Sequence, residues 1–117
     1  MLWLLLSLSF PSYFTAQQTT LAEIIIEKAK PVGEDPYLLV ATAWVESRLN
    51  PISISKTNDY GLFQINWTFW GRKWGYKDRK SFYKDMSNPY HATVAAMVVL
   101  KEMRRYKTCQ GLNLPAC

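Results

Sequence analysis

Residues 46–66 read ESRLNPISISKTNDYGLFQIN, an acid followed by a turn-rich stretch and a short apolar segment. Glu46 comes directly after the apolar run VATAWV at residues 40–45, and it is the only carboxylate between Asp35 and Asp59. An ionised side chain is expensive to bury among apolar neighbours. An acid at the end of an apolar helical run is therefore a candidate for a chemical role.

Two helix signals precede this stretch. Thr20 and Glu23 form a capping-box pattern, which predicts a helix from residue 20 to about residue 30. The pair Asp35-Pro36 combines an N-cap residue with proline at the first helical position, and it predicts a second helix that ends at Arg48 or Leu49. The apolar residues expected on one face of this second helix, beside Glu46, are Leu38, Ala41, Val45 and Leu49.

The region after Leu49 contains a turn-rich stretch and, further on, the start of a long helix. Residues 50–60 carry turn-forming residues without helical periodicity, which predicts loops with short strands. Asn88-Pro89 then opens a long helix, and His91 is expected in its first turn. The expected buried face of that helix comprises Ala92, Ala95, Ala96, Val99, Leu100 and Met103.

The chain of 117 residues is long enough for one domain with one core. Residues 2–10 are apolar and uncharged, but nine residues are too few to cross a bilayer, which needs about 20 in a helix. A signal-peptide core fits this segment better than a membrane span. We therefore expect an exported chain, with a signal peptide over residues 1–16 and a single domain over residues 17–117.

The net charge of +5 comes mainly from the region after Gly71. A basic face attracts polyanions such as nucleic acid, anionic lipid or an acidic cell wall, and a solvated surface is the simpler interpretation. No element that reads nucleic acid is recognisable in the sequence. The basic residues after Gly71 are Arg72, Lys73, Lys77, Arg79, Lys80, Lys84, Lys101, Arg104, Arg105 and Lys107.

The cysteines and the single histidine do not predict a metal site. Cys109 and Cys117 are the only cysteines, and with His91 alone they lack the ligand spacing of a zinc cluster. In an exported chain the two cysteines could form a disulfide. We expect no metal and no cofactor.

Glu46 and Asp59 are the candidates for acid chemistry. Cleavage of a glycosidic bond needs a proton donor for the departing oxygen. A carboxylic acid can supply that proton when apolar neighbours hold its pKa near the working pH. Glu46 is the best candidate for this acid. The simpler alternatives are an ion pair with Arg48 or a nearby lysine, or a cap at the helix end. Asp59 is a candidate second carboxylate, although Asn58-Asp59 is also a common turn pair.

A family resemblance rests on four elements: Glu46-Ser47, Asn50-Pro51, Ser55 and Gly61-Leu62-Phe63-Gln64-Ile65. Together they resemble the catalytic motif of the lytic transglycosylases of the soluble, goose-lysozyme-like type, including the spacing from the acid to the Gly-Leu-x-Gln element. The likeness extends over roughly residues 20–107. It implies an α+β, predominantly α-helical, lysozyme-like fold with a small irregular β region.

By this resemblance, Glu46 is the catalytic acid and then the base, and the partner is the glycan strand of peptidoglycan. The implied reaction cleaves the β-1,4 bond between N-acetylmuramic acid and N-acetylglucosamine. The substrate's acetamido group assists, its C6 hydroxyl closes a 1,6-anhydro ring, and no water is consumed. The residues expected to bind substrate are Ser47, Gly61, Leu62, Gln64, Asn66 and Trp70, with Gly61 allowing the backbone to approach the sugar.

Two departures from the family pattern define the alternatives. Asn58-Asp59 replaces a Gly-Ala pair, so residues 59–66 also resemble the strand of chicken-type lysozymes, in which the aspartate is a second carboxylate. This makes a hydrolase that uses Glu46 and Asp59 the alternative, although the spacing from Glu46 favours the transglycosylase. Specialised transglycosylases of secretion and conjugation systems also show an aspartate at this place.

The second departure concerns the family's Tyr-Asn-x-Gly element, which follows the long helix. The sequence has LPAC at residues 114–117 and lacks that element. A C-terminally truncated domain or a non-catalytic peptidoglycan-binding module would explain the difference. Wall remodelling, secretion or conjugation systems and phage assembly are all compatible settings.

Overall fold

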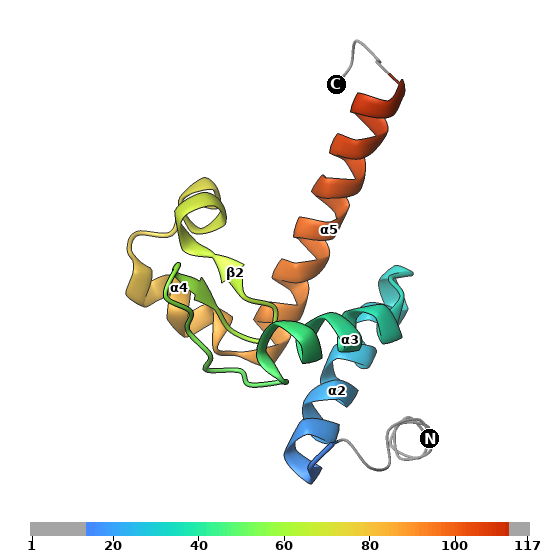
Figure 1. Ribbon diagram of the computed structural model, residues 1–117, viewed down its shortest axis with the longest axis vertical. Coiled ribbons are helices and arrows are strands. Elements are labelled where there is room, and N and C mark those ends of the chain that lie inside the picture. Colours follow the sequence, from blue (N-terminus) through green and yellow to red (C-terminus); the bar gives the residue numbers. More distant parts are fainter. Residues whose placement is uncertain (1–13, 113–117) are drawn as a thin grey trace.

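The computed structural model describes residues 14–112, and side chains are described as far as residue 105. The long helix α5 (Pro89–Leu112) runs through the molecule, and most of the other elements gather around its first half (Figure 1). Helices α2 (Ala16–Ala29) and α3 (Pro36–Ser47) pack together on one side of it. The short strands and the helical segments that follow them lie on the other side, so the expected α+β, predominantly α-helical fold is confirmed.

The β region is a single antiparallel pair within the described residues. Strand β1 (Asp59–Tyr60) pairs with β2 (Ile65–Asn66), with Asp59 opposite Asn66 and Tyr60 opposite Ile65. An isolated bridge joins Ile54 to Tyr60. The chain then forms a π-helix, η2 (Trp67–Gly71), and the short helix α4 (Arg79–Met86). The prediction of loops with short strands over residues 50–60 is confirmed.

The start of α2 differs from the predicted start. The helix begins at Ala16, one turn earlier than predicted, because Thr15 is its N-cap and forms a capping box with Gln18. Thr20 lies inside the helix, where its hydroxyl donates to the Ala16 carbonyl at 3.1 Å. The capping box predicted for Thr20 and Glu23 is therefore wrong. Both pairs fit the same pattern, and the good helix formers between them extend the helix to the earlier cap.

The buried face of α3 also differs from the prediction. Leu39, Val40 and Ala43 are buried, whereas Leu38 is 54% exposed and Val45 is 72% exposed. Of the predicted stripe Leu38, Ala41, Val45 and Leu49, only Leu49 is buried. The helix is apolar on nearly every side, so periodicity alone cannot choose its face. Packing against α2 decides it, and the segment beside Glu46 remains exposed.

The core lies where α2 and α4 pack on α5, with α3 packed on α2. Small residues on α5 allow this close approach, since Ala92, Ala95 and Ala96 are buried, whereas Met103 of the predicted face is 52% exposed. Burying a large aliphatic or aromatic side chain contributes about 1.5–3 kcal/mol. The largest fully buried side chains are Phe82, Ile25, Ile26, Leu39, Leu49, Leu62, Met86 and Val40.

An ion pair attaches the connection between α2 and α3 to the second half of α5. It contains a short 3-10 helix, η1 (Lys30–Val32), followed by Gly33 and Glu34. Both terminal nitrogens of Arg104 donate to the Glu34 carboxylate. Arg104 thereby links α5 to the start of α3 across 70 positions of sequence.

Several predictions concern residues outside the described part of the chain. Most of the expected signal peptide and Cys117 are not described, nor is the side chain of Cys109. Over residues 14–112, no helix is long and apolar enough to cross a membrane.

Gly61 positions the turn between the strands against α4. Its φ is +81°, and a Cβ built there would lie 2.3 Å from the carbonyl oxygen of Met86. Gly61 is buried. The close approach that the structure shows to need glycine is to α4. The expectation that Gly61 also lets the backbone approach a sugar stays a prediction.

A Gly61→Ala substitution should destabilise the fold well beyond the backbone strain alone. Gly75 is a matched control, because it has the same φ of +81° but a Cβ added there would meet no atom within 4 Å. Alanine in the left-handed region costs about 1–2 kcal/mol, and forcing α4 away should add about 1–3 kcal/mol at Gly61 only. Urea unfolding of both variants measures the difference, and equal losses would contradict this packing.

Candidate functional site

Glu46 lies in the last turn of α3 and is exposed. Within the described residues, no hydrogen bond or ion pair involves its carboxylate. The alternative of a pair with Arg48 is wrong, because the Arg48 guanidinium lies over the Trp44 ring, 4.9 Å from its centroid. The apolar residues of its own helix do not bury Glu46 either, since neighbouring Val45 is 72% exposed. Glu46 is thus an accessible carboxylate that no described residue engages.

The position of Glu46 is electrostatically unfavourable for a carboxylate. The C-terminal end of a helix carries a partial negative charge, which favours cations and disfavours anions. Helix α3 has no basic residue in its last turn to offset this. Within the described residues, nothing therefore compensates the charge of Glu46 at the end of α3.

Ser47 fixes the end of α3 against the turn between the strands. Its hydroxyl donates to the Leu62 carbonyl at 2.7 Å, and it accepts from the Asn50 amide at 3.2 Å. Leu62 itself is fully buried, so its side chain belongs to the core. The two halves of the sequence motif, Glu46-Ser47 and Gly61–Gln64, are thereby brought together.

Gln64 holds the loop before β1 to this turn. Its side-chain nitrogen donates to the carbonyls of Ser53 at 3.2 Å and Gly61 at 3.0 Å. The residue is half-buried and has a φ of +52°. The amide of Gln64 therefore has a positioning role within the loop as well as any contact with substrate.

Asp59 is held by hydrogen bonds on both carboxylate oxygens. Ser55 and Thr57 donate to Oδ2, with the Ser55 contact at 2.7 Å, and Asn66 donates to Oδ1 at 3.0 Å. Burial raises the pKa of Asp59, but the hydrogen bonds from Thr57, Ser55 and Asn66 together bring it below its ordinary value of 3.8. Asp59 is consequently an ionised carboxylate that organises the turn around it.

Strained backbone conformations concentrate around these residues. Among the residues that the structure describes, four non-glycine residues have a positive φ: Arg48, Leu49, Asn58 and Gln64. The first two follow Glu46-Ser47 directly, with φ values of 56° and 58°. Such conformations cost about 1–3 kcal/mol each and cluster at functional sites. All four lie between residues 46 and 66, which marks this region as the candidate site.

Asn66 connects the strand pair to an aromatic surface. Its side-chain oxygen accepts from the Phe69 amide at 2.9 Å and caps the π-helix η2. The Trp70 ring centroid lies 4.8 Å from that of Phe69 and 5.3 Å from that of Trp74. Lys73 sits over Phe69 and Trp70, and it pairs with Glu102 of α5 at 2.7 Å. Trp70 is half-buried, so part of its ring can meet a ligand.

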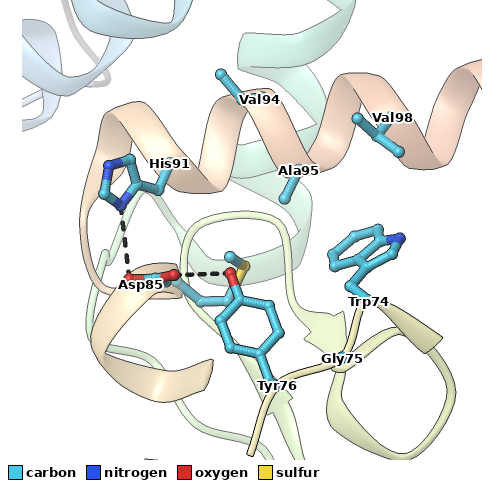
Figure 2. Close-up of a pocket in the computed structure, with 9 residues that line it drawn as sticks. Trp74, Gly75, Tyr76, Asp85, His91, Val94, Ala95 and Val98 are labelled. Carbon is cyan, nitrogen blue, oxygen red and sulfur yellow. Dashed lines mark hydrogen bonds and ion pairs between the residues drawn. The ribbon is translucent and has the colours of Figure 1, made fainter. Parts of the chain in front are cut away.

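A cavity of about 570 Å³ lies between this aromatic segment and α5 (Figure 2). Tyr76 donates to Asp85 Oδ2 at 2.7 Å, and Nδ1 of His91 is 3.8 Å from Asp85 Oδ1. Burial, the hydrogen bond to Asp85 and the negative charge of Asp85 raise the pKa of Tyr76 to about 12. Sequence reasoning placed His91 correctly in the first turn of α5 but missed this cluster, because no local pattern joins the three residues.

Metal-ligating side chains do not gather in the part of the chain that the structure describes. Among those residues, no group of three or more histidine, cysteine, aspartate and glutamate side chains could hold an ion.

The stability of the protein should depend on pH through Asp59. Its pKa is lower in the folded state, so the unfolded chain takes up a proton first as the pH falls, and stability decreases through and below about pH 4. Asp59→Asn should cost about 1 kcal/mol at neutral pH through lost hydrogen bonds. It should also weaken the pH dependence of the free energy of unfolding between neutral pH and about pH 3, as measured by urea unfolding. Parallel curves for the two chains would show that Asp59 does not contribute in this way.

Of three comparisons with known proteins, the one with family models gives a match. A sequence model described as the Transglycosylase SLT domain matches residues 23–116, a range that includes every site residue from Glu46 to Trp70. No curated protein and no solved structure gives a significant match. The matched range covers most of the chain. The chain therefore belongs to the Transglycosylase SLT domain family.

Proposed function

We propose that the protein is a peptidoglycan lytic transglycosylase that cleaves the β-1,4 bond between N-acetylmuramic acid and N-acetylglucosamine, with Glu46 as its single acid and base. The family supports a transglycosylase-type action on peptidoglycan in general. The observation that carries the proposal is the contrast between two carboxylates. Glu46 is exposed and engages no described residue, whereas both oxygens of Asp59 accept hydrogen bonds within the turn.

One carboxyl group is sufficient for this reaction. Protonated Glu46 gives its proton to the glycosidic oxygen as the bond from that oxygen to C1 of the muramic acid breaks. The acetamido group of the same sugar stabilises the electron-poor C1. The Glu46 carboxylate then removes the proton of the C6 hydroxyl, whose oxygen bonds to C1 and closes the 1,6-anhydro ring. Glu46 ends protonated again, and no water enters the balance.

Substrate itself would complete the surroundings of Glu46. A glycan strand laid across an exposed carboxyl excludes water from it, and electrostatic interactions strengthen when water is excluded. Ser47, Gln64, Asn66 and Trp70 are the proposed substrate-side residues around Glu46. Gly61 and Leu62 act through the backbone shape of the turn, because both are buried.

A lysozyme-type hydrolase is the second candidate, and Asp59 is the observation that favours it. The lowered pKa keeps Asp59 ionised, and an ionised carboxylate can stabilise positive charge on a sugar ring. Three donors already occupy its oxygens, however, which disfavours direct attack on C1. The products distinguish the two reactions.

Digestion of purified peptidoglycan followed by mass spectrometry should release fragments that carry 1,6-anhydro ends. These fragments are lighter by one water than hydrolytic products, because the C6 hydroxyl replaces water. Reducing ends alone would establish the hydrolase instead. Binding of peptidoglycan without any release of fragments would identify a non-catalytic wall-binding module.

A Glu46→Gln substitution should abolish fragment release, preserve glycan binding and leave the fold as stable or more stable. Removing the charge from the end of α3 should stabilise by about 0.3–1 kcal/mol. Glu27→Gln is the matched control, since Glu27 is also exposed in the last turn of its helix. It should show full activity and a smaller gain in urea unfolding, because Lys28 in the same turn offsets part of the unfavourable charge. Retained cleavage by Glu46→Gln would refute the role of Glu46.

Kinetic measurements can decide whether Asp59 acts as a second catalytic carboxylate beside Glu46. Asp59→Asn should lower the rate of fragment release much less than Glu46→Gln, because Asp59 acts through the turn. Equal losses at the two positions would favour the hydrolase. The rates should be normalised to the concentration of folded protein, because Asp59→Asn also weakens the turn.

The proposed setting is the cell envelope. We propose that residues 1–16 direct export and that residues 17–117 form the peptidoglycan-acting domain. Secretion or conjugation machinery, phage assembly and general wall remodelling are the processes that use such a domain.

A further inference from the structure

The residues on either side of Glu46 are held by the N-terminal end of the described chain. Trp44 and Arg48 each lie two positions from Glu46, one before it and one after it. The Phe14 ring packs on the Trp44 ring, with the two centroids 5.3 Å apart. The side-chain nitrogen of Gln18 donates to the Arg48 carbonyl at 3.1 Å, across 30 positions of sequence. The end of α3 is therefore fixed by two residues that flank the start of α2.

The Arg48 carbonyl lies where the helix no longer supplies a donor. Arg48 and Leu49 have φ values of 56° and 58°, so the chain leaves the helical path directly after Ser47. The last carbonyl groups of a helix have no partner within that helix. Among the described residues, Gln18 supplies the hydrogen bond to this carbonyl. Left-handed conformations of non-glycine residues persist only when surrounding contacts hold them, and the Gln18 side chain is such a contact.

The Gln18 amide makes two contacts that can be separated. Its oxygen Oε1 accepts from the Thr15 amide at 2.8 Å, and the Thr15 hydroxyl accepts from the Gln18 amide at 3.1 Å. This capping box belongs to α2 and does not involve Arg48. The nitrogen Nε2 makes the contact with the Arg48 carbonyl. One half of the side-chain amide therefore starts α2, and the other half holds the turn after Glu46.

We propose that Gln18, supported by Phe14, is a positioning residue for Glu46, and that the working protein retains the segment from Phe14 onwards. The inference rests on the proposed function and adds a structural requirement to it. The Trp44 ring contacts both the Phe14 ring and the Arg48 guanidinium, so the two sides of Glu46 are held together. A displacement of about 1 Å can cost an enzyme roughly a hundredfold in rate. Contacts that fix the chain beside the acid therefore act on turnover.

The same contacts bear on the processing of the N-terminal segment. Cleavage after Ala16 would remove Phe14, Thr15 and the first residue of α2, and Gln18 would lose the partner that orients its amide. An exported chain that keeps the positioning contacts is cut before Phe14 or remains uncut. Mass spectrometry of the protein recovered from the cell envelope should therefore show an N-terminus at or before Phe14. Recovery of an active protein that begins at Gln17 would overturn this requirement.

A Gln18→Glu substitution in the full chain separates the two contacts. Glutamate still accepts from the Thr15 amide and is a usual partner in a capping box, so α2 keeps its start. It cannot donate to the Arg48 carbonyl. Initial rates of fragment release over a range of peptidoglycan concentrations should show kcat lowered roughly two- to tenfold, the range that one hydrogen bond explains, with KM unchanged. The rates should be normalised to the concentration of folded protein.

The matched control is Gln17→Glu. Gln17 is exposed, precedes Gln18 directly in α2 and receives the same change of charge. This variant should leave kcat and KM unchanged. Equal losses of kcat in the two variants would indicate an effect of the added charge and would overturn the positioning role.

Nuclear magnetic resonance provides a readout that does not depend on activity. The backbone amide signals of Arg48 and Leu49 should shift in Gln18→Glu and stay in place in Gln17→Glu, because only the first change removes the contact with the Arg48 carbonyl. Shifted signals together with an unchanged kcat would show that the contact serves the fold alone, which would overturn the proposal. Unmoved signals in Gln18→Glu would overturn it as well.

These outcomes are distinguishable from a failure of the proposed function. If the unmodified protein releases anhydro fragments and Gln18→Glu releases them at the same rate, the proposed function stands and the positioning role is wrong. If the unmodified protein releases no fragments, both proposals are wrong.

Discussion

The hydrogen bond from the Ser47 hydroxyl to the Leu62 carbonyl, at 2.7 Å, joins the helix that carries Glu46 to the turn between the strands. Its formation requires α3 to stop abruptly and the chain to reverse. Arg48 and Leu49 achieve this by adopting left-handed backbone conformations one after the other. On the other side of the bond, Gly61 allows the turn to rest on the end of α4. Glu46 thus owes its position to backbone geometry.

The two acids of the site illustrate how environment divides their roles. Asp59 accepts hydrogen bonds from Ser55, Thr57 and Asn66, and these bonds build the strand pair. Glu46 gives the fold nothing comparable, and its charge lies at the unfavourable end of a helix. A charge at a cost to the fold, next to strained backbone, is the observation behind the role proposed for Glu46.

The sequence predicted those parts of the structure that depend on local signals. The starts of α3 and α5 follow from Asp35-Pro36 and Asn88-Pro89, where cap and proline act within a few residues. The buried face of α3 could not be predicted, because an almost uniformly apolar helix takes its orientation from α2. The start of α2 was misplaced because two overlapping patterns fit the same capping rule. The cavity at Asp85 joins three separate segments, and only the fold brings them together.

Two effects oppose each other at Leu49, the strain of its backbone and the burial of its side chain. Its left-handed conformation costs about 1–2 kcal/mol, and glycine at this position would remove that cost. The same change would remove a side chain that is 2% exposed and leave a cavity, which would destabilise the fold by about 2–5 kcal/mol. Because the loss from the cavity exceeds the relief of strain, the leucine and its strained backbone are favoured together. Variants selected for heat resistance should therefore keep Leu49 and the turn beside Glu46, and carry their stabilising substitutions at other positions.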